Sequence, residues 1–143
     1  MGIRELFNSY DKRKRRSHFK NLFAVAWVDG EVNRAEMDLI ISLAEKFQMT
    51  TAEVTNIIRN PDSVRHHLPK KPGERMEHLY DLVTVMLVDG TIDERELVLC
   101  KSMAAKLGFK EENVGPMLRE MMDRSMHGVA PEKAVEALLE KYS

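Results

Sequence analysis

The stretch VDGEVNRAE, residues 28–36, returns sixty residues later as VDGTIDERE, residues 88–96. In both copies a Gly follows an apolar run, where it can end a helix in the left-handed conformation, and an Asn or Asp three residues on can cap the next helix. A Glu three residues after the cap completes a capping box. We therefore expect each copy to form the tight turn of a helical hairpin. The residues are Gly30, Asn33 and Glu36 in the first copy and Gly90, Asp93 and Glu96 in the second.

The repetition extends well beyond this motif. Residues 15–54 align without a gap on residues 75–114, at a constant offset of 60. A unit of that length would bury its apolar faces poorly alone, so we expect two helical-hairpin repeats packed about a pseudo-twofold axis. The link between them is predicted at HHLPKKPG, residues 66–73. Aligned identities include His18 with His78, Leu22 with Leu82, Val25 with Val85, Asp29 with Asp89 and Leu39 with Leu99.

The apolar periodicity of the chain is helical. Apolar residues recur at spacings of three and four, as in Leu39, Leu43 and Phe47, and no segment alternates with period two for long enough to predict a strand. The sequence therefore predicts an all-α fold, a compact bundle of about seven or eight helices forming one domain over residues 1–143. The expected helices are residues 15–28, 33–48, 51–59, 74–88, 93–107, 111–124 and 131–142, with a short helix at 3–9 and a turn at 63–68.

Composition narrows the class of protein. Hydrophobic residues make up 43% and charged residues 31%, which is typical of a folded globular chain, and the net charge of -1 points to no single class of partner. A lone Cys100 cannot form an internal disulfide, and its apolar neighbours predict burial rather than reactivity. The first residues lack a secretory apolar stretch, and no apolar run is long enough to span a membrane. A cytoplasmic location is expected.

The acidic turns are also candidate metal sites. Asp29 and Asp89 are predicted at the C-terminal ends of helices, where the helix dipole disfavours an anion. Each carboxylate could be offset by local backbone N–H donors or by a bound cation, and both explanations stay open. The first half of an EF-hand is absent, so a calmodulin-type site is not expected. The candidate ligands for calcium or magnesium are Asp29, Glu36, Asp89, Asp93 and Glu96.

Two segments built on these turns carry a family resemblance. AVAWVDGEVNRAEMDLIISLAEKF, residues 24–47, and VTVMLVDGTIDERELVLCKSMAAKLG, residues 83–108, resemble the tellurite-resistance TerB-like family. The resemblance implies a compact helical bundle with two related halves. It also implies a non-enzymatic module linked to stress response and metal resistance. Cation binding by acidic residues would fall on Asp29, Glu36, Asp89 and Glu96.

Three functions follow as hypotheses. The first is a non-enzymatic binding or scaffolding module that responds to a divalent cation and acts on a protein partner. The alternative is a metal-free protein-interaction module whose Asp-Gly turns are purely structural. A metal-dependent hydrolase using both acidic loops is the third. No Gly-rich phosphate loop or nucleophile elbow is present, and no catalytic residue is singled out.

A basic stretch, two histidines and a methionine series are further candidates for binding surfaces. The basic stretch at residues 12–20 could contact an anionic membrane surface, and without interleaved aromatic residues it does not favour nucleic acid. His18 and His78 each lie about 16 Å along a helix from the Asp of their own turn, so packing or surface roles are expected for both. A methionine series is expected to pack in the core rather than form an adaptable surface. It consists of Met117, Met121, Met122 and Met126.

Overall fold

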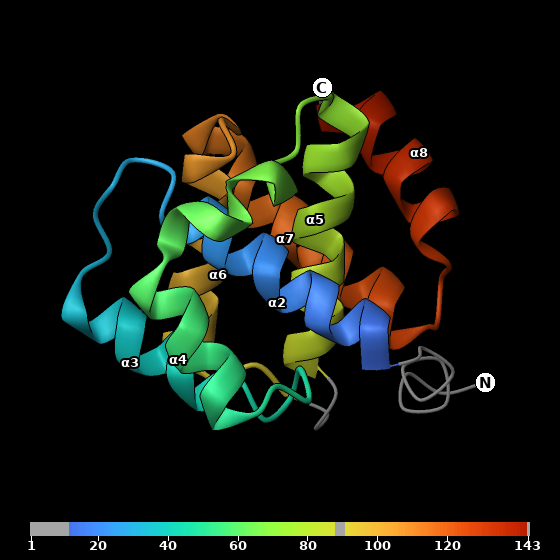
Figure 1. Ribbon diagram of the computed structural model, residues 1–143. Coiled ribbons are helices and arrows are strands. Elements are labelled where there is room, and N and C mark those ends of the chain that lie inside the picture. Colours follow the sequence, from blue (N-terminus) through green and yellow to red (C-terminus); the bar gives the residue numbers. More distant parts are fainter. Residues whose placement is uncertain (1–11, 88–90, 143) are drawn as a thin grey trace.

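The computed structural model describes residues 12–87 and 91–142, with side chains from Arg16 onward. Within these ranges every regular element is a helix, as the periodicity predicts (Figure 1). The element bounds are α2 Lys12–Ala26, α3 Arg34–Leu43, α4 Thr51–Arg59, the 3₁₀ helix η1 Pro61–His67, α5 Pro72–Met86, α6 Glu94–Lys106, α7 Glu111–Met126 and α8 Pro131–Tyr142.

Most predicted helices are confirmed, and the residues at 51–59 and 131–142 match α4 and α8 at both ends. The main error is α3, which ends at Leu43 although helix was expected up to residue 48. Residues 44–47 continue as tight turns, and Gln48 adopts a positive φ of 58° that a helix cannot continue through. The expected helix at 3–9 lies outside the described residues.

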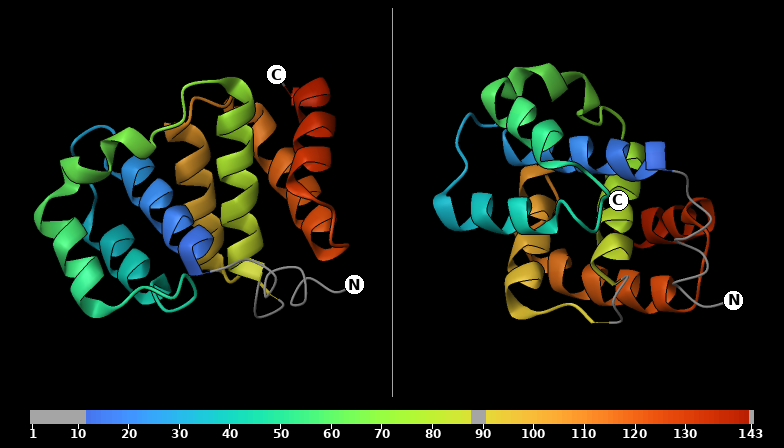
Figure 2. Two further views of the ribbon diagram at one scale, coloured as in Figure 1. Left: turned by 45° about the vertical axis from the view of Figure 1, so that its right-hand side comes forward. Right: turned by 60° about the horizontal axis from the view of Figure 1, so that its bottom comes forward.

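Helix α5 is the centre of the bundle. Nine consecutive residues, from Leu79 to Leu87, are all buried, so the C-terminal half of this helix is covered on every side. Helices α2, α6, α7 and α8 all pack against it, and α2 crosses it on one face (Figures 1 and 2). A helix that is buried all round needs polar groups to be satisfied internally. Accordingly, the Thr84 hydroxyl donates to the Tyr80 carbonyl and lies 2.9 Å from the Ser125 hydroxyl.

The two sides of the bundle have different covers. Helix α4 and η1 pack over α2 on one side, whereas α7 and α8 enclose α5 on the other (Figure 2). The Tyr80 hydroxyl donates to the Val129 carbonyl at 2.8 Å and so ties α5 to the α7–α8 connection. No described helix is long and apolar enough to cross a membrane.

The predicted core assignments hold for Cys100 and for most of the methionine series, but not for Met126. Cys100 is buried, as are Met117 and Met121. Met122 is only partly buried, and Met126 is 56% exposed at the end of α7. The methionine series is therefore mainly a packing face, with only its last member at the surface.

Candidate functional site

The first acidic turn joins α2 to α3. Gly30 has a φ of 79°, the left-handed conformation expected of it. The Asn33 side chain caps α3 by accepting the Glu36 backbone N–H at 2.8 Å. The Asn33 amide donates to Glu36 Oε1 at 3.1 Å, so Glu36 meets the side chain of the cap rather than its backbone N–H. The predicted capping box is thus replaced by a side-chain pair in this turn.

The second turn caps α6 with the full predicted geometry. Asp93 Oδ1 accepts the Glu96 backbone N–H at 2.8 Å, and Glu96 Oε1 accepts the Asp93 backbone N–H at 3.1 Å. This reciprocal pair is the complete capping box. The predicted ligand Asp89 and the helix stop Gly90 lie outside the described residues.

A lysine from elsewhere in the chain reaches each turn. Lys106, at the end of α6, places its Nζ 2.7 Å from the Ala26 carbonyl and 3.4 Å from Glu36 Oε2. Lys46, just after α3, places its Nζ 3.3 Å from the Met86 carbonyl and 3.0 Å from Glu96 Oε2. We call these two contacts the crossed lysine bridges. Their members correspond at the offset of 60: Lys46 with Lys106, Ala26 with Met86 and Glu36 with Glu96.

Each ammonium group has a clear electrostatic role. The carbonyls of Ala26 and Met86 belong to the last residues of α2 and α5, where backbone acceptors lack a partner within the helix and the dipole is negative. The lysines donate to those carbonyls and also neutralise the capping glutamates. An ammonium therefore sits where two kinds of oxygen converge, which is the position that a bound cation would take.

The two turns lie at opposite ends of one helix pair. Glu36 lies in the first turn of α3 and contacts Lys106 at the end of α6. Glu96 lies in the first turn of α6 and contacts Lys46, which follows α3. The rise of α6 separates Glu96 from Lys106 by about 15 Å. A single cation could therefore be held by one turn, but not by Glu36 and Glu96 together.

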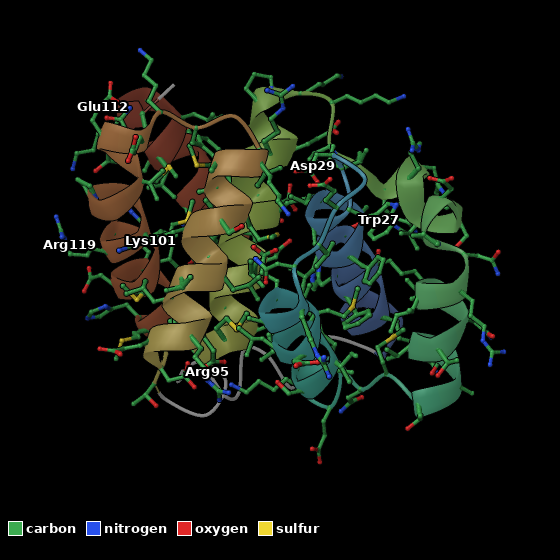
Figure 3. The ribbon with its side chains drawn as sticks, turned by 90° about the vertical axis from the view of Figure 1, so that its left-hand side faces the viewer. Trp27, Asp29, Arg95, Lys101, Glu112 and Arg119 are labelled. Atoms are coloured by element: carbon green, nitrogen blue, oxygen red, sulfur yellow. The ribbon has the colours of Figure 1, made fainter. Side chains whose placement is uncertain are left out.

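Asp29 lies in the exposed loop beyond α2 (Figure 3). Its Oδ1 accepts the Glu31 backbone N–H at 3.2 Å, which is the local hydrogen bond that offsets an anion at this end of the helix. Asp93 is exposed, and Arg95 approaches its carboxylate at 3.7 Å. Across the described ranges, no three His, Cys, Asp or Glu side chains are grouped as a metal site would require.

A second polar cluster joins α2 to α5 and was missed by the sequence reasoning. His18 Nδ1 lies 3.6 Å from Asp81 Oδ2, and both residues line a cleft of about 280 Å³ together with His78. Each histidine lies too far along its helix from the Asp of its own turn, and that spacing does not reveal a partner on the other helix. Asp81 was overlooked, although it stands on the apolar face of its helix between Leu79 and Leu82, where a carboxylate needs a partner.

The environment of His78 favours its neutral form. Burial lowers the pKa of His78, the nearby Glu74 carboxylate opposes this effect, and His67 adds to it weakly. The buried His78 Nδ1 has no hydrogen-bond partner within the described chain. Protonating that nitrogen would bury an unpaired donor, so the imidazole serves here as a packed, uncharged side chain.

The one thiol of the chain is chemically quiet. Burial, with a smaller contribution from the Glu96 carboxylate, raises the pKa of Cys100 to about 12. At neutral pH the side chain is therefore a thiol rather than a thiolate, and it is a poor nucleophile.

Comparison of the chain with family models, curated proteins and solved structures found no match.

Proposed function

We propose that this chain is a non-enzymatic binding module of the TerB-like kind, whose acidic turns hold its helices together without metal. The observation that carries the proposal is the pair of crossed lysine bridges. Lys106 and Lys46 already supply positive charge to the capping glutamates and to the ends of α2 and α5. A divalent ion is then not needed for either turn to be electrostatically satisfied.

We further propose that residues 15–54 and 75–114 are two halves related by a pseudo-twofold axis. Support comes from the exchange of lysines, because each bridge joins one half to the other and the two bridges match at the offset of 60. A link to stress response and to metal resistance rests on the family resemblance. Growth of a deletion strain under tellurite and metal stress tests that link, and unchanged growth would contradict it.

A cation-responsive module is the second candidate, and a specific observation favours it. The exposed Asp29 and the partly exposed Glu36 flank the end of α2, so a divalent ion could compete with Lys106 for oxygens of this turn. Calcium would then switch the turn from a lysine-held to a metal-held state. The corresponding candidate ligands in the sequence of the second turn are Asp93, Glu96 and Asp89.

Affinity capture separates the two candidates. The immobilised full chain is exposed to a lysate of the source organism, once with chelator and once with calcium. A metal-free module retains the same proteins in both conditions, whereas a cation-responsive module retains them only with calcium. A chain that retains no protein in either condition would contradict the binding function itself.

Calorimetry tests the site directly. Calcium and then magnesium are titrated into chelator-treated wild type, Lys106→Met and Asp29→Asn. If the lysine bridge replaces metal, the wild type gives no saturating heat at millimolar concentrations. If the ion competes with lysine, Lys106→Met binds it more tightly than the wild type, and Asp29→Asn binds it more weakly.

A further inference from the structure

A groove between α4 and η1 stands apart from both acidic turns. Its volume is about 950 Å³, and Lys20 of α2 and Met49 also line it. This volume lies within the range of sites that enclose a ligand of substantial size. We call it the α4–η1 groove, and α4 and η1 form one flank of the molecule (Figures 1 and 2).

The groove carries positive charge that the described chain does not neutralise. Lys20 and Arg59 line it, and neither has an acidic partner among the described residues. The two carboxylates on the groove, those of Glu53 and Asp62, are held by arginines. Arg16 contacts Glu53 at 3.0 Å and Arg65 contacts Asp62 at 2.9 Å, so these acids do not offset the free cations.

Two adjacent imidazoles line the groove as well. The rings of His66 and His67 have their centroids 4.3 Å apart, and both side chains line the groove. The pKa of His67 is lowered by burial and then by the positive charges of His66 and Lys20. Lys20 is therefore close enough to act on the imidazole of His67.

The floor of the groove is apolar and its walls can hydrogen-bond. Ile57 and Val64 are among the floor residues, whereas Asn56, Asn60 and Ser63 contribute amide and hydroxyl groups. An extended peptide offers backbone N–H and C=O groups for such side chains, and an aliphatic side chain for such a floor. A single small anion would use only the cations.

The same lining disfavours nucleic acid. The groove is lined by no Phe, Tyr or Trp, the side chains on which bases stack in single-strand binding sites. Cations and aliphatic side chains in one lining fit carboxylates and an aliphatic side chain on one peptide.

We propose that the α4–η1 groove binds an acidic peptide segment of a partner protein. Carboxylates of that segment pair with Lys20 and Arg59, and an aliphatic side chain between them rests on Ile57 and Val64. This inference rests on the proposed binding function and gives it a surface and a partner chemistry. Charge complementarity supplies the specificity and raises the association rate.

The test is a selection from displayed random twelve-residue peptides on the full chain. Enriched peptides are then synthesised with a fluorescent label and measured by anisotropy. The groove variant is Lys20→Glu/Arg59→Glu. The matched control is Lys101→Glu/Arg119→Glu, which reverses two exposed cations on α6 and α7, on the side away from α4 and η1 (Figure 3). Circular dichroism verifies that both variants are folded.

The expected result is enrichment of Asp and Glu around an aliphatic residue. Affinity should fall about tenfold to hundredfold in the groove variant and stay at the wild-type value in the control. Raising the salt concentration should weaken binding in the wild type and have little effect on the residual binding of the groove variant.

Four results would overturn the inference. Peptides without acidic enrichment, or peptides that bind the groove variant as tightly as wild type, would rule out the groove while leaving a protein-binding module in place. Displacement of the peptide by a twelve-nucleotide single-stranded DNA, with loss of DNA binding in the groove variant, would assign the groove to nucleic acid. A selection that enriches no peptide would count against both the groove and the proposed function.

Discussion

The two acidic turns share a motif, but their capping glutamates are not equally buried. The Glu96 side chain is 8% exposed and pairs with Lys46 at 3.0 Å, whereas the Glu36 side chain is 19% exposed and pairs with Lys106 at 3.4 Å. The second turn also has a complete capping box, while in the first turn the Asn33 side chain takes the place of a backbone donor. One motif thus yields a buried junction and a more open one.

The difference in burial indicates which turn can more easily exchange its lysine for another cation. A buried carboxylate depends strongly on its cation, because water cannot replace a lost partner. A partly exposed carboxylate keeps access to water and to ions, so its lysine is more easily replaced. The second turn is therefore the stability element, and the first turn is the place where a cation or a partner could act.

The largest predicted effect is removal of the buried bridge. Lys46→Met should lower the free energy of unfolding by about 3 kcal/mol, because Glu96 stays buried without a cation. Lys106→Met should lower it by about 1–2 kcal/mol, since Glu36 is better solvated and the main loss is the bond to the Ala26 carbonyl. Denaturant unfolding measures both values.

Lys101→Met is the control for that comparison. Lys101 is exposed on α6, and its substitution should change stability by no more than about 0.5 kcal/mol. If Lys106→Met proves as destabilising as Lys46→Met, the distinction between a buried and an open turn is wrong.

Cys100 reports on the same distinction. The thiol is buried four residues after Glu96, so it should resist a disulfide reagent at about pH 8 in the native protein. Labelling requires opening of the fold, and a loss of about 3 kcal/mol in Lys46→Met should speed it about hundredfold. Lys106→Met should speed it much less. Equal rates in the two variants would show that the second turn does not control access to this part of the core.

Acidification should have a smaller effect on stability, because the corresponding residues His18 and His78 have different surroundings. His18 faces Asp81, whereas burial lowers the pKa of His78 below its usual 6.5. In the pH window below 6.5 the unfolded chain binds more protons at residue 78 than the folded chain does, so acidification must lower stability. Urea unfolding at about pH 7.5 and about pH 5.5 measures the decline.

His78→Gln should reduce that decline, and His127→Gln, at an exposed position, should leave it unchanged. The pKa of His67 is also lowered, so some of the decline should persist in His78→Gln. A variant that retains the full decline would show that the buried imidazole does not contribute.

The smallest predicted effect is the gain in stability from a complete capping box in the first turn. Asn33→Asp gives this turn the same cap as the second, and it should raise stability by about 0.5 kcal/mol by completing a capping box and adding an anion at a helix N-terminus. Thermal melting measures the change. A lower melting temperature would mean that the amide contact from Asn33 to Glu36 is worth more than the backbone bond that replaces it.

The helices could be predicted well because their signals are local. Apolar spacing defined α4, and apolar spacing together with the Asp93 cap defined α6 to within one residue. The early end of α3 was missed because the apolar pattern continues through Phe47, which is buried from a turn rather than from a helix. Burial and helical conformation usually coincide, and here they separate.

The candidate site could be predicted only in part. The cap residues were visible in the sequence, but their lysine partners were not. Lys46 and Lys106 each lie ten residues after the glutamate of their own repeat. Each lysine instead reaches the glutamate of the other repeat, fifty or seventy residues away. Pairing of that kind depends on how α3 packs against α6, and a linear pattern does not contain it.

The crossed lysine bridges have a consequence for assembly. Residues 68–71 connect η1 to α5, and both bridges join the part before this connector to the part after it. Two molecules that open at the connector could therefore exchange their C-terminal parts and rebuild the same bridges between chains. Such a domain-swapped dimer needs no new surface, only a connector that favours an extended path. Shortening residues 68–71 would be a direct route to such a dimer.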